Sequence, residues 1–176
     1  MTVYFQPVVD AKTGEITAAE ALIRWIHPEK GFISPDVFIP ALEESRHISE
    51  LDLYVLREVN EFQKKRHEAG KPVVPVSVNL SWMDFYDETI MGWLKAKCED
   101  TSMPSSLCRL EITETSYAAI EQNRNATLDY LRDAGIQILL DDFGSGYFSF
   151  GMLQKYNFDI MKVDMSFVRQ IENNPK

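Results

Sequence analysis

Short runs of apolar and β-branched residues alternate with longer amphipathic stretches from one end of the chain to the other. Strand patterns that alternate with helix patterns are typical of βα units, in which helices connect the strands of a parallel sheet. Six strands are expected, over residues 4–10, 16–25, 73–80, 108–113, 136–142 and 158–163. Helices are expected over residues 35–44, 50–69, 85–98 and 116–134, with a short helix over 152–156.

The first two predicted strands are expected to form a hairpin. Lys12-Thr13-Gly14-Glu15 joins them, and glycine is typical of such a tight turn. The remainder reads β-α-β-α-β-α-β without a linker, so residues 1–176 are predicted to form one domain. An eight-stranded α/β barrel takes about 250 residues. The expected fold is therefore a TIM-like (β/α) barrel of the α/β class with an antiparallel opening strand, truncated after the sixth strand.

Composition excludes several classes of protein. The 176 residues include 18 Lys and Arg against 27 Asp and Glu, which gives a formal charge of −9, and 45% of residues are hydrophobic. An acidic chain is a poor match for a nucleic-acid backbone, which requires a basic face, so neither DNA nor RNA is expected as a partner. No run approaches the ~20 apolar residues of a membrane span, so this segment is expected to make no membrane contact.

The cysteines and the N-terminus indicate a reducing compartment. Cys98 and Cys108 form no CxxC pair and have no histidine at zinc-ligand spacing. Such sparse cysteines are typical of reduced, cytoplasmic proteins. The N-terminus has neither the basic region nor the cleavage site of a signal peptide. A cytoplasmic location is expected, either alone or within a larger, membrane-anchored signalling protein.

Polar side chains recur at or near the C-terminal ends of the predicted strands, where barrel enzymes carry their active sites. Within residues 76–80, the alternation of strand side chains places three apolar residues on one face and Ser77 and Asn79 on the other. The same alternation separates Glu111 and Lys162 from their apolar neighbours, so the polar groups are predicted to converge on the barrel interior. The set comprises Glu20, Asn79, Glu111, Asp141, Asp142, Lys162 and Asp164.

Carboxylates crowded in such an interior need a counter-charge. Burial and mutual repulsion both disfavour their charged form, so unpaired they would protonate or destabilise the fold. A hard divalent cation resolves this conflict, and oxygen ligands from Glu, Asp and Asn suit Mg²⁺ or Mn²⁺. The absence of a histidine or cysteine cluster disfavours zinc. A second interpretation stays open, in which these residues are exposed strand-end charges or form a salt-bridged layer of the barrel.

Two adjacent acids, Asp141 and Asp142, end a predicted strand and precede a loop that contains Gly144 and Gly146. Neighbouring residues of a regular strand face opposite ways, so we expect a bulge or a strand end that lets both carboxylates approach the same mouth. Adjacent acids can reach two neighbouring metal ions. The glycines permit a positive φ or the close approach of a ligand, and a plain turn is the alternative.

Five motifs follow one another in order along the chain. They are Glu20-Ala21-Leu22 followed by Arg24, Ser77-Val78-Asn79-Leu80-Ser81, Glu111-Ile112-Thr113-Glu114, Asp141-Asp142-Phe143-Gly144-Ser145-Gly146-Tyr147 and Lys162-Val163-Asp164. In this combination they strongly resemble the EAL domain, a family that hydrolyses cyclic di-GMP. The resemblance covers essentially the whole chain.

The resemblance implies a role for each matching residue. Two ions, Mg²⁺ or Mn²⁺, would be bound, the first by Glu20, Asn79, Glu111 and Asp141 and the second with help from Asp141 and Asp142. The implied catalytic residues are Glu20, Asp142 and Lys162, with Lys162 orienting the attacking water. The implied substrate contacts are Gln6, Leu22, Arg24 and Asp164, with Arg24 at a phosphate. Glu114 would steady the loop over residues 142–147.

The implied reaction is attack of a metal-activated hydroxide on one phosphodiester of cyclic di-GMP, which gives linear pGpG. A further glutamate and a glutamine-glycine-tyrosine motif of the family are not found in this sequence, so weak or absent hydrolysis by this chain alone is expected. Two alternatives stay open: a receptor that binds cyclic di-GMP without turnover, and an interaction or dimerisation module. Strand edges left open by truncation predict a homodimer or an exchanged oligomer.

Overall fold

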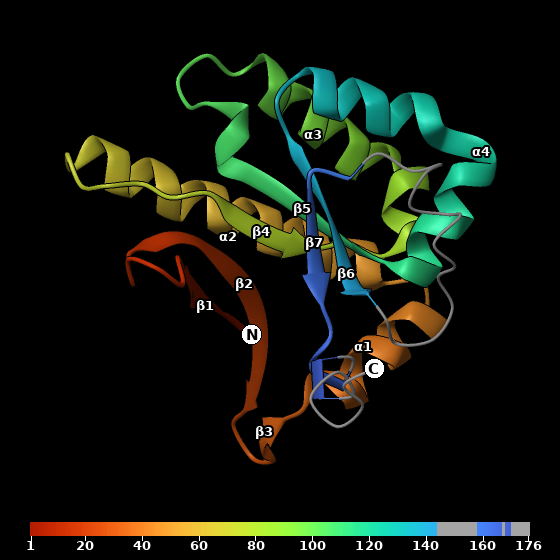
Figure 1. Cartoon of the computed structure of the whole chain (residues 1–176). Coiled ribbons are helices and arrows are strands. Elements are labelled where there is room, and N and C mark those ends of the chain that lie inside the picture. Colours follow the sequence, from red (N-terminus) through yellow and green to blue (C-terminus); the bar gives the residue numbers. More distant parts are fainter. Residues whose placement is uncertain (144–157, 167, 170–176) are drawn as a thin grey trace.

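The computed structural model describes residues 1–143, 158–166, 168 and 169, which form a single curled sheet with helices against it (Figure 1). The strands are β1 (Thr2–Val9), β2 (Ile16–His27), β3 (Gly31–Ile33), β4 (Val76–Asn79), β5 (Cys108–Thr113), β6 (Gln137–Phe143) and β7 (Ile160–Val163). The helices are α1 (Pro35–Glu44), α2 (Ile48–Glu68), α3 (Glu88–Glu99) and α4 (Glu114–Asp133), and two 3-10 turns are η1 (Trp82–Tyr86) and η2 (Ser105–Leu107).

The strands follow the order β1-β2-β4-β5-β6-β7, and β3 pairs with β2 alone. β1 runs antiparallel to β2, whereas each later pair along this order is parallel. Parallel neighbours require crossover connections, and α2, α3 and α4 lie in those from β2 to β4, β4 to β5 and β5 to β6, while most of the β6–β7 connection lies outside the described residues. The result is a curled half-barrel of six main strands with an antiparallel opening strand, which confirms the predicted fold class.

The predicted opening hairpin is present, and its turn begins at Asp10, which was expected to end the first strand. The Asp10 carboxylate accepts hydrogen bonds from the backbone N–H groups of Lys12 and Thr13 at 2.8 and 2.9 Å. The backbone N–H of Asp10 donates to the carbonyl of Glu15 at 2.9 Å, and Gly14 takes a φ of 73°. This left-handed conformation is open to glycine without steric cost, which explains the residue at that position.

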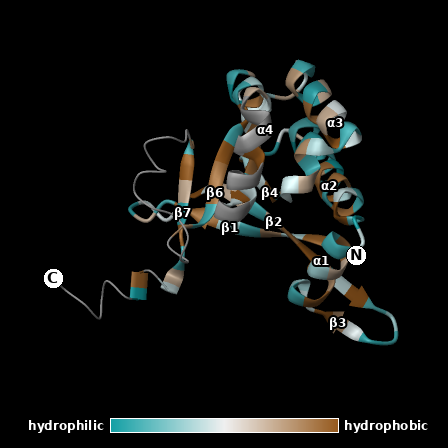
Figure 2. Cartoon of the chain, turned by 90° about the vertical axis from the view of Figure 1, so that its right-hand side faces the viewer, coloured by the Kyte–Doolittle hydropathy of each residue, from teal (hydrophilic) through white to brown (hydrophobic). Residues whose placement is uncertain are grey.

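The helices cover one face of the sheet and form the core with it. α2 packs against β1, β2 and β4, and α4 packs against β5 and β6. The side chains that the central strands direct towards these helices are almost fully buried. They include Val76, Val78, Leu110, Ile112, Ile138 and Leu140. In Figure 2, the brown segments of the strands are these and other hydrophobic residues. None of the described helices is long and apolar enough to cross a membrane.

Some elements differ from the sequence prediction. β3 and η1 were not predicted, and the helix expected over 85–98 begins later, at Glu88, because η1 occupies the preceding residues. The strand expected over 73–80 is shorter, since Pro72 and Pro75 have no N–H to donate to a sheet. The short helix expected over 152–156 lies outside the described residues.

Candidate active site

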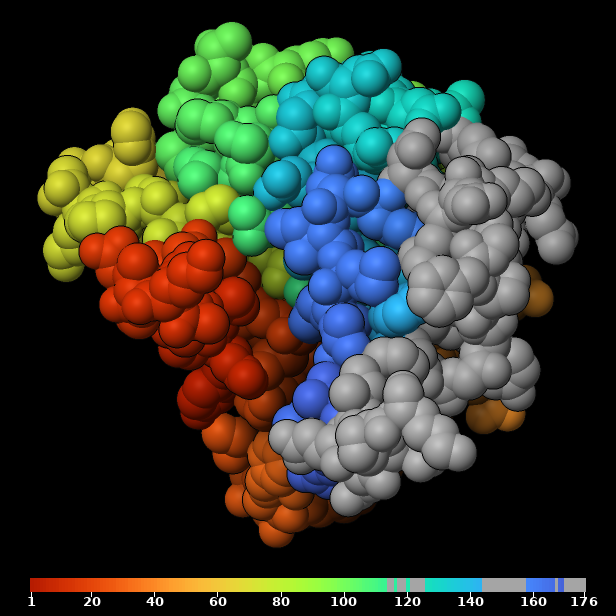
Figure 3. All heavy atoms as spheres, in the orientation of Figure 1, coloured from red at the N-terminus to blue at the C-terminus, as the bar shows by residue number. Residues whose placement is uncertain are grey.

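Lys162 on β7 lies among three acidic side chains that other strands contribute. Its Nζ is 3.0 Å from Glu20 Oε2 on β2, 2.7 Å from Glu111 Oε2 on β5 and 3.3 Å from Asp141 Oδ1 on β6. Asn79, at the end of β4, donates a hydrogen bond from Nδ2 to Glu20 Oε1 at 3.2 Å. The structure therefore brings together five predicted site residues from five strands, on the face of the sheet opposite the helices. In the space-filling view, the β1–β2 hairpin (red) and β7 (blue) lie on either side of this concave face (Figure 3).

The charges in this cluster stabilise one another. The Glu111 side chain is 1% exposed, and burial raises the pKa of its carboxyl above the ordinary value, although hydrogen bonds from Lys162 and Ser77 act in the opposite direction. Burial alone would lower the pKa of the Lys162 ammonium. Its hydrogen bonds to Glu111 and Glu20 and the nearby Asp141 charge outweigh burial and raise that pKa. Lys162 therefore stays protonated and can donate a hydrogen bond to a water but cannot accept a proton from one.

The adjacent acids Asp141 and Asp142 lie at an irregular strand end. The register of β6 against β7 shifts between Leu140 and Phe143, and Asp142 takes a φ of 57°. Aspartate is one of the few residue types that tolerate this left-handed backbone. The Asp141 side chain points to Lys162, while Asp142 is exposed. The predicted bulge is thus present, and the predicted glycine loop after it lies outside the described residues.

Three predicted substrate contacts lie on the opening hairpin. Glu20, Leu22 and Arg24 alternate along β2 and so share one side of it. Gln6 pairs directly with Glu20 across the β1–β2 ladder, which places both side chains on that side as well. Arg24 is partly buried, and its Nη1 donates a hydrogen bond to the carbonyl of Ile23 at 2.9 Å. The concave face beside Glu20 therefore carries an amide and a guanidinium.

Two predicted residues lie at the ends of other elements. Asp164 directly follows β7, and its Oδ1 accepts hydrogen bonds from the Ser166 hydroxyl and from the Ser166 backbone N–H. These bonds lower the pKa of the Asp164 carboxyl and stabilise the turn that follows. Glu114 opens α4 directly after the N-cap Thr113. Most of its predicted partner loop, over residues 142–147, lies outside the described residues.

The side chains around Lys162 suit a hard divalent cation in their chemistry. Three carboxylates and one amide supply oxygen donors, which Mg²⁺, Mn²⁺ and Ca²⁺ prefer. Within the described part of the chain, no three acidic, histidine or cysteine side chains form a metal cluster by themselves. The carboxylates here converge on an ammonium instead, which is the salt-bridged arrangement that the sequence left open. The same point in space already accommodates a positive charge, so these donors fit a cation at this position.

The model of one protein family, described as the EAL domain, matches residues 1–176. The chain belongs to the EAL domain family. Among EAL relatives, a protein of Sinorhizobium fredii, y4lL, is 38% identical over 97% of this chain and 20% of its own length. The cyclic di-GMP phosphodiesterase NbdA of Pseudomonas aeruginosa is 31% identical over 97% of this chain and 22% of its own length. The chain thus spans less than a third of these relatives, so it matches one part of each.

Solved EAL structures share the fold. The PaMucR phosphodiesterase in complex with c-di-GMP superposes with a TM-score of 0.86 at 28% identity and covers 99% of this chain and 70% of that one. A calcium and cyclic di-GMP complex of Klebsiella pneumoniae BlrP1 gives a TM-score of 0.74 at 25% identity, with 96% and 41% covered. The half-barrel described above is therefore an EAL architecture, in a family that is generally metal dependent.

Two further features of this EAL site lie beside the predicted residues. Ser77, which the alternation placed on the interior face without a role, is 3% exposed, donates a hydrogen bond to the Ala19 carbonyl at 3.4 Å and contacts the Glu111 carboxyl. Arg109, two residues before Glu111 on β5, was missed from the sequence, and its Nε donates to Gln137 Oε1 at 2.8 Å. Arg109 follows the same two-residue period as Glu111, so that alternation was a signal that could have found it.

Proposed function

We propose that this chain is an EAL phosphodiesterase domain that binds divalent cations and hydrolyses cyclic di-GMP to linear pGpG. The observation that carries the proposal is the convergence of Glu20, Glu111 and Asp141 on one positively charged point. A pure scaffold has no need to gather three carboxylates there, since desolvation and repulsion make such a cluster costly. The family membership and a relative named as a cyclic di-GMP phosphodiesterase support the same reaction class.

The chain's own residues can divide the work as follows. Glu20, Asn79, Glu111 and Asp141 would hold one divalent cation, and Asp141 with Asp142 would help to hold a second. Two bound cations lower the pKa of a water and neutralise charge on the phosphate. Glu20 and Asp142 would thereby act as catalytic residues.

Lys162 has a different role in the proposed reaction. Because its pKa is raised, it would orient a water as a hydrogen-bond donor while a carboxylate or the bulk solvent takes the proton. Moving the three carboxylates from the ammonium to a cation would free Lys162 Nζ for that contact. Its Nζ lies within 3.3 Å of Glu20, Glu111 and Asp141, which supports a role for Lys162 beside the proposed cation site.

Arg24 would bind a phosphate of the ligand. One hydrogen bond to the Ile23 carbonyl fixes its guanidinium, and a guanidinium carries five N–H donors in a planar fork that matches phosphate oxygens. Gln6 and Leu22 share this face of the hairpin and would contact the same ligand, with Asp164 approaching from β7. Glu114 would steady the loop over residues 142–147 from the start of α4.

Calorimetric titration with cyclic di-GMP, in parallel with Mg²⁺, Mn²⁺, Ca²⁺ and a chelator, tests the proposal. We expect saturable binding that a divalent cation strengthens and a chelator weakens. Glu20→Ala should abolish the cation dependence, whereas Glu29→Ala, which removes an exposed acid at the turn after β2, should not change it. Binding that ignores cations and survives Glu20→Ala would rule the proposal out.

A second candidate is a receptor that binds cyclic di-GMP without cleaving it, and the Lys162 cluster is the observation that favours it. The ammonium satisfies three carboxylates without a metal, so the site is electrostatically stable in a metal-free state. Chromatography of the same mixtures separates the two functions. Formation of pGpG identifies a phosphodiesterase, while binding without pGpG identifies a receptor.

A further inference from the structure

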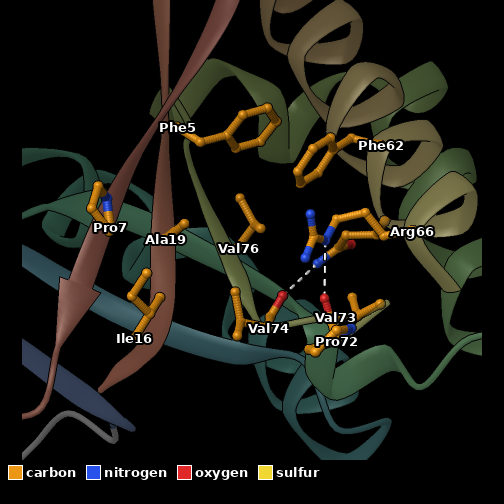
Figure 4. Close-up of a pocket in the computed structure, with 11 residues that line it drawn as sticks. Phe5, Pro7, Ile16, Ala19, Phe62, Arg66, Pro72, Val73, Val74 and Val76 are labelled. Carbon is orange, nitrogen blue, oxygen red and sulfur yellow. Dashed lines mark hydrogen bonds between the residues drawn. The ribbon is translucent and has the colours of Figure 1, made fainter. Parts of the chain in front are cut away.

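A pocket of about 340 Å³ lies between the β1–β2 hairpin and the C-terminal part of α2 (Figure 4). It is on the helix-covered face of the sheet, since Ala19 and Val76 line it while Glu20 faces the other way. Its volume falls within the range of about 300–1,000 Å³ that small-molecule sites occupy. Most of its described lining is apolar and includes Phe5, Ile16, Phe62 and Val73. The pocket is therefore separate from the Lys162 cluster.

Arg66 is the charged residue among the described lining residues, and its position is fixed. Its Nε donates a hydrogen bond to the Pro72 carbonyl at 2.9 Å, and its guanidinium carbon lies 5.7 Å from the centre of the Phe62 ring. Phe62 in turn stacks on Phe5 with the ring centres 4.3 Å apart. Figure 4 shows the Arg66 side chain extending beside Phe62 towards Val76. A guanidinium held in this way loses little side-chain entropy when it binds a ligand.

Arg66 is better placed than the other polar lining residue, Gln63, to donate hydrogen bonds to a ligand in the pocket. Gln63 also lines the pocket, but its Nε2 donates to the carbonyls of Val74 and Leu107 at 3.1 and 2.9 Å. Lys71 follows Arg66 at this end of α2, in a chain whose formal charge is −9, while Lys65 is paired with Glu61. Local positive charge in an acidic protein favours an anion at this end of α2.

We propose that this pocket binds a small amphipathic organic anion, with its acidic group on Arg66 and its apolar body between the stacked Phe5–Phe62 pair and Val76. A carboxylate can accept two parallel hydrogen bonds from a guanidinium. The apolar body replaces water against the aromatic and aliphatic walls, which supplies most of the binding energy. Both a medium-chain fatty acid and an aromatic carboxylic acid have this chemistry.

Calorimetric titration of the whole chain with decanoate and with 2-naphthoate tests the proposal, with 2-naphthol as the uncharged counterpart of the second acid. Saturable binding of at least one acid is expected, and the tighter of the two identifies the kind of apolar body. Because a hydrogen bond to a charged group is stronger than one to a neutral group, 2-naphthol should bind at least about tenfold more weakly than 2-naphthoate if the aromatic acid is the ligand. No saturable binding of either acid, or equal binding of 2-naphthol and 2-naphthoate, would overturn the proposal.

Two variants localise the site. Arg66→Gln should weaken acid binding about tenfold, whereas Lys65→Gln removes the same charge one residue away, at a side chain that pairs with Glu61, and should leave it unchanged. Ile16→Glu places a carboxylate at the pocket rim on a residue that is 58% exposed, so the fold is retained while acid binding falls. Acid binding that is equal in the wild type and in both pocket variants would contradict the assignment, as would an equal loss in Lys65→Gln.

Discussion

The Lys162 ammonium on β7 lies within 3.3 Å of carboxylates on β2, β5 and β6, so one residue joins four strands of the sheet. The two-residue period predicted that Glu20, Glu111 and Lys162 face the barrel interior, because alternation is a local property of a strand. That one ammonium contacts three carboxylates depends on how four strands far apart in the sequence align with one another, and the pattern within a single strand does not give that alignment. The direction of each site residue could therefore be predicted, but its partners could not.

Removing that ammonium should make the fold depend on a divalent cation. Lys162→Gln leaves three carboxylates without their shared counter-charge, so we expect a loss of about 2–3 kcal/mol in the free energy of unfolding. Added Ca²⁺ or Mg²⁺ should restore more of it in this variant than in the wild type. Thermal unfolding with cation and with chelator measures both effects, and Lys95→Gln on the exposed side of α3 is the control. A cation response no larger than that of the control would contradict the expectation.

Asp52 and Asp84 form a buried pair of acidic residues away from the Lys162 cluster, and no sequence signal indicated this pair. Asp84 is fully buried and Asp52 is 8% exposed, and the two carboxyl groups share a hydrogen bond between α2 and η1. Burial, and for Asp52 also the charge of Asp84, raises the pKa of both carboxyls. Asp84 Oδ2 also accepts the Ser81 N–H at 2.8 Å. The raised pKa values mean that the pair keeps a proton to a higher pH than a free aspartate does.

This pair should make the protein less stable as the pH rises. Above pH of about 4 an unfolded aspartate loses its proton while the folded pair keeps one, so stability falls by up to about 1.4 kcal/mol per pH unit until the raised pKa is passed. Asp52→Asn keeps the hydrogen bond without the proton and should flatten this dependence. Urea unfolding at pH 5 and pH 8 measures it. Glu50→Gln, an exposed change on the same helix, should keep the wild-type slope; an equal slope in Asp52→Asn would refute the argument.

At the scale of elements, those with strong end signals were predicted best. α1 spans Pro35–Glu44 as expected, because proline at the first helical position fixes where the helix begins. α4 ends before Gly135, whose φ of 96° suits glycine. α3 was placed too early, since Phe85 continues its apolar pattern into η1. There the Ser81 and Asp84 capping box starts a separate 3-10 turn, and such a break within a continuous apolar pattern escapes periodicity.

The N-cap of α3 gives a test at this scale. The Asp87 carboxylate accepts hydrogen bonds from the N–H groups of Thr89 and Ile90 at 2.8 and 3.0 Å. Asp87→Ala leaves those donors without this partner and should lower the free energy of unfolding by about 1 kcal/mol. Glu88→Ala, at the exposed next position, removes a like charge but no cap. Equal urea midpoints for the two variants would show that the Asp87 side chain does not stabilise α3 as its N-cap.

For the whole molecule, the sequence predicted the α/β class, the six main strands and the antiparallel opening because each depends on repeated local patterns. The curvature of the sheet depends on the twist and packing of all its strands together, so it could not be predicted from any one strand. This curvature also determines how far apart the two edge strands lie. β1 and β7 are the end strands of the described sheet. Their exposed apolar side chains include Tyr4, Val8, Val9, Met161 and Val163.

Those two ends predict self-association. An end strand with apolar side chains offers unpaired backbone groups to a second chain, so we expect a dimer or a larger oligomer that dissociates on dilution. Met161→Lys with Val163→Lys should shift the equilibrium towards the monomer, because charged side chains oppose edge pairing. Val37→Lys alters a residue that is 65% exposed on α1, away from both end strands, and should leave the equilibrium unchanged. Sedimentation velocity over a range of concentrations measures the shift. A wild-type chain that stays monomeric at every concentration would contradict the expectation, because it would show that the two edge strands do not pair with a second chain.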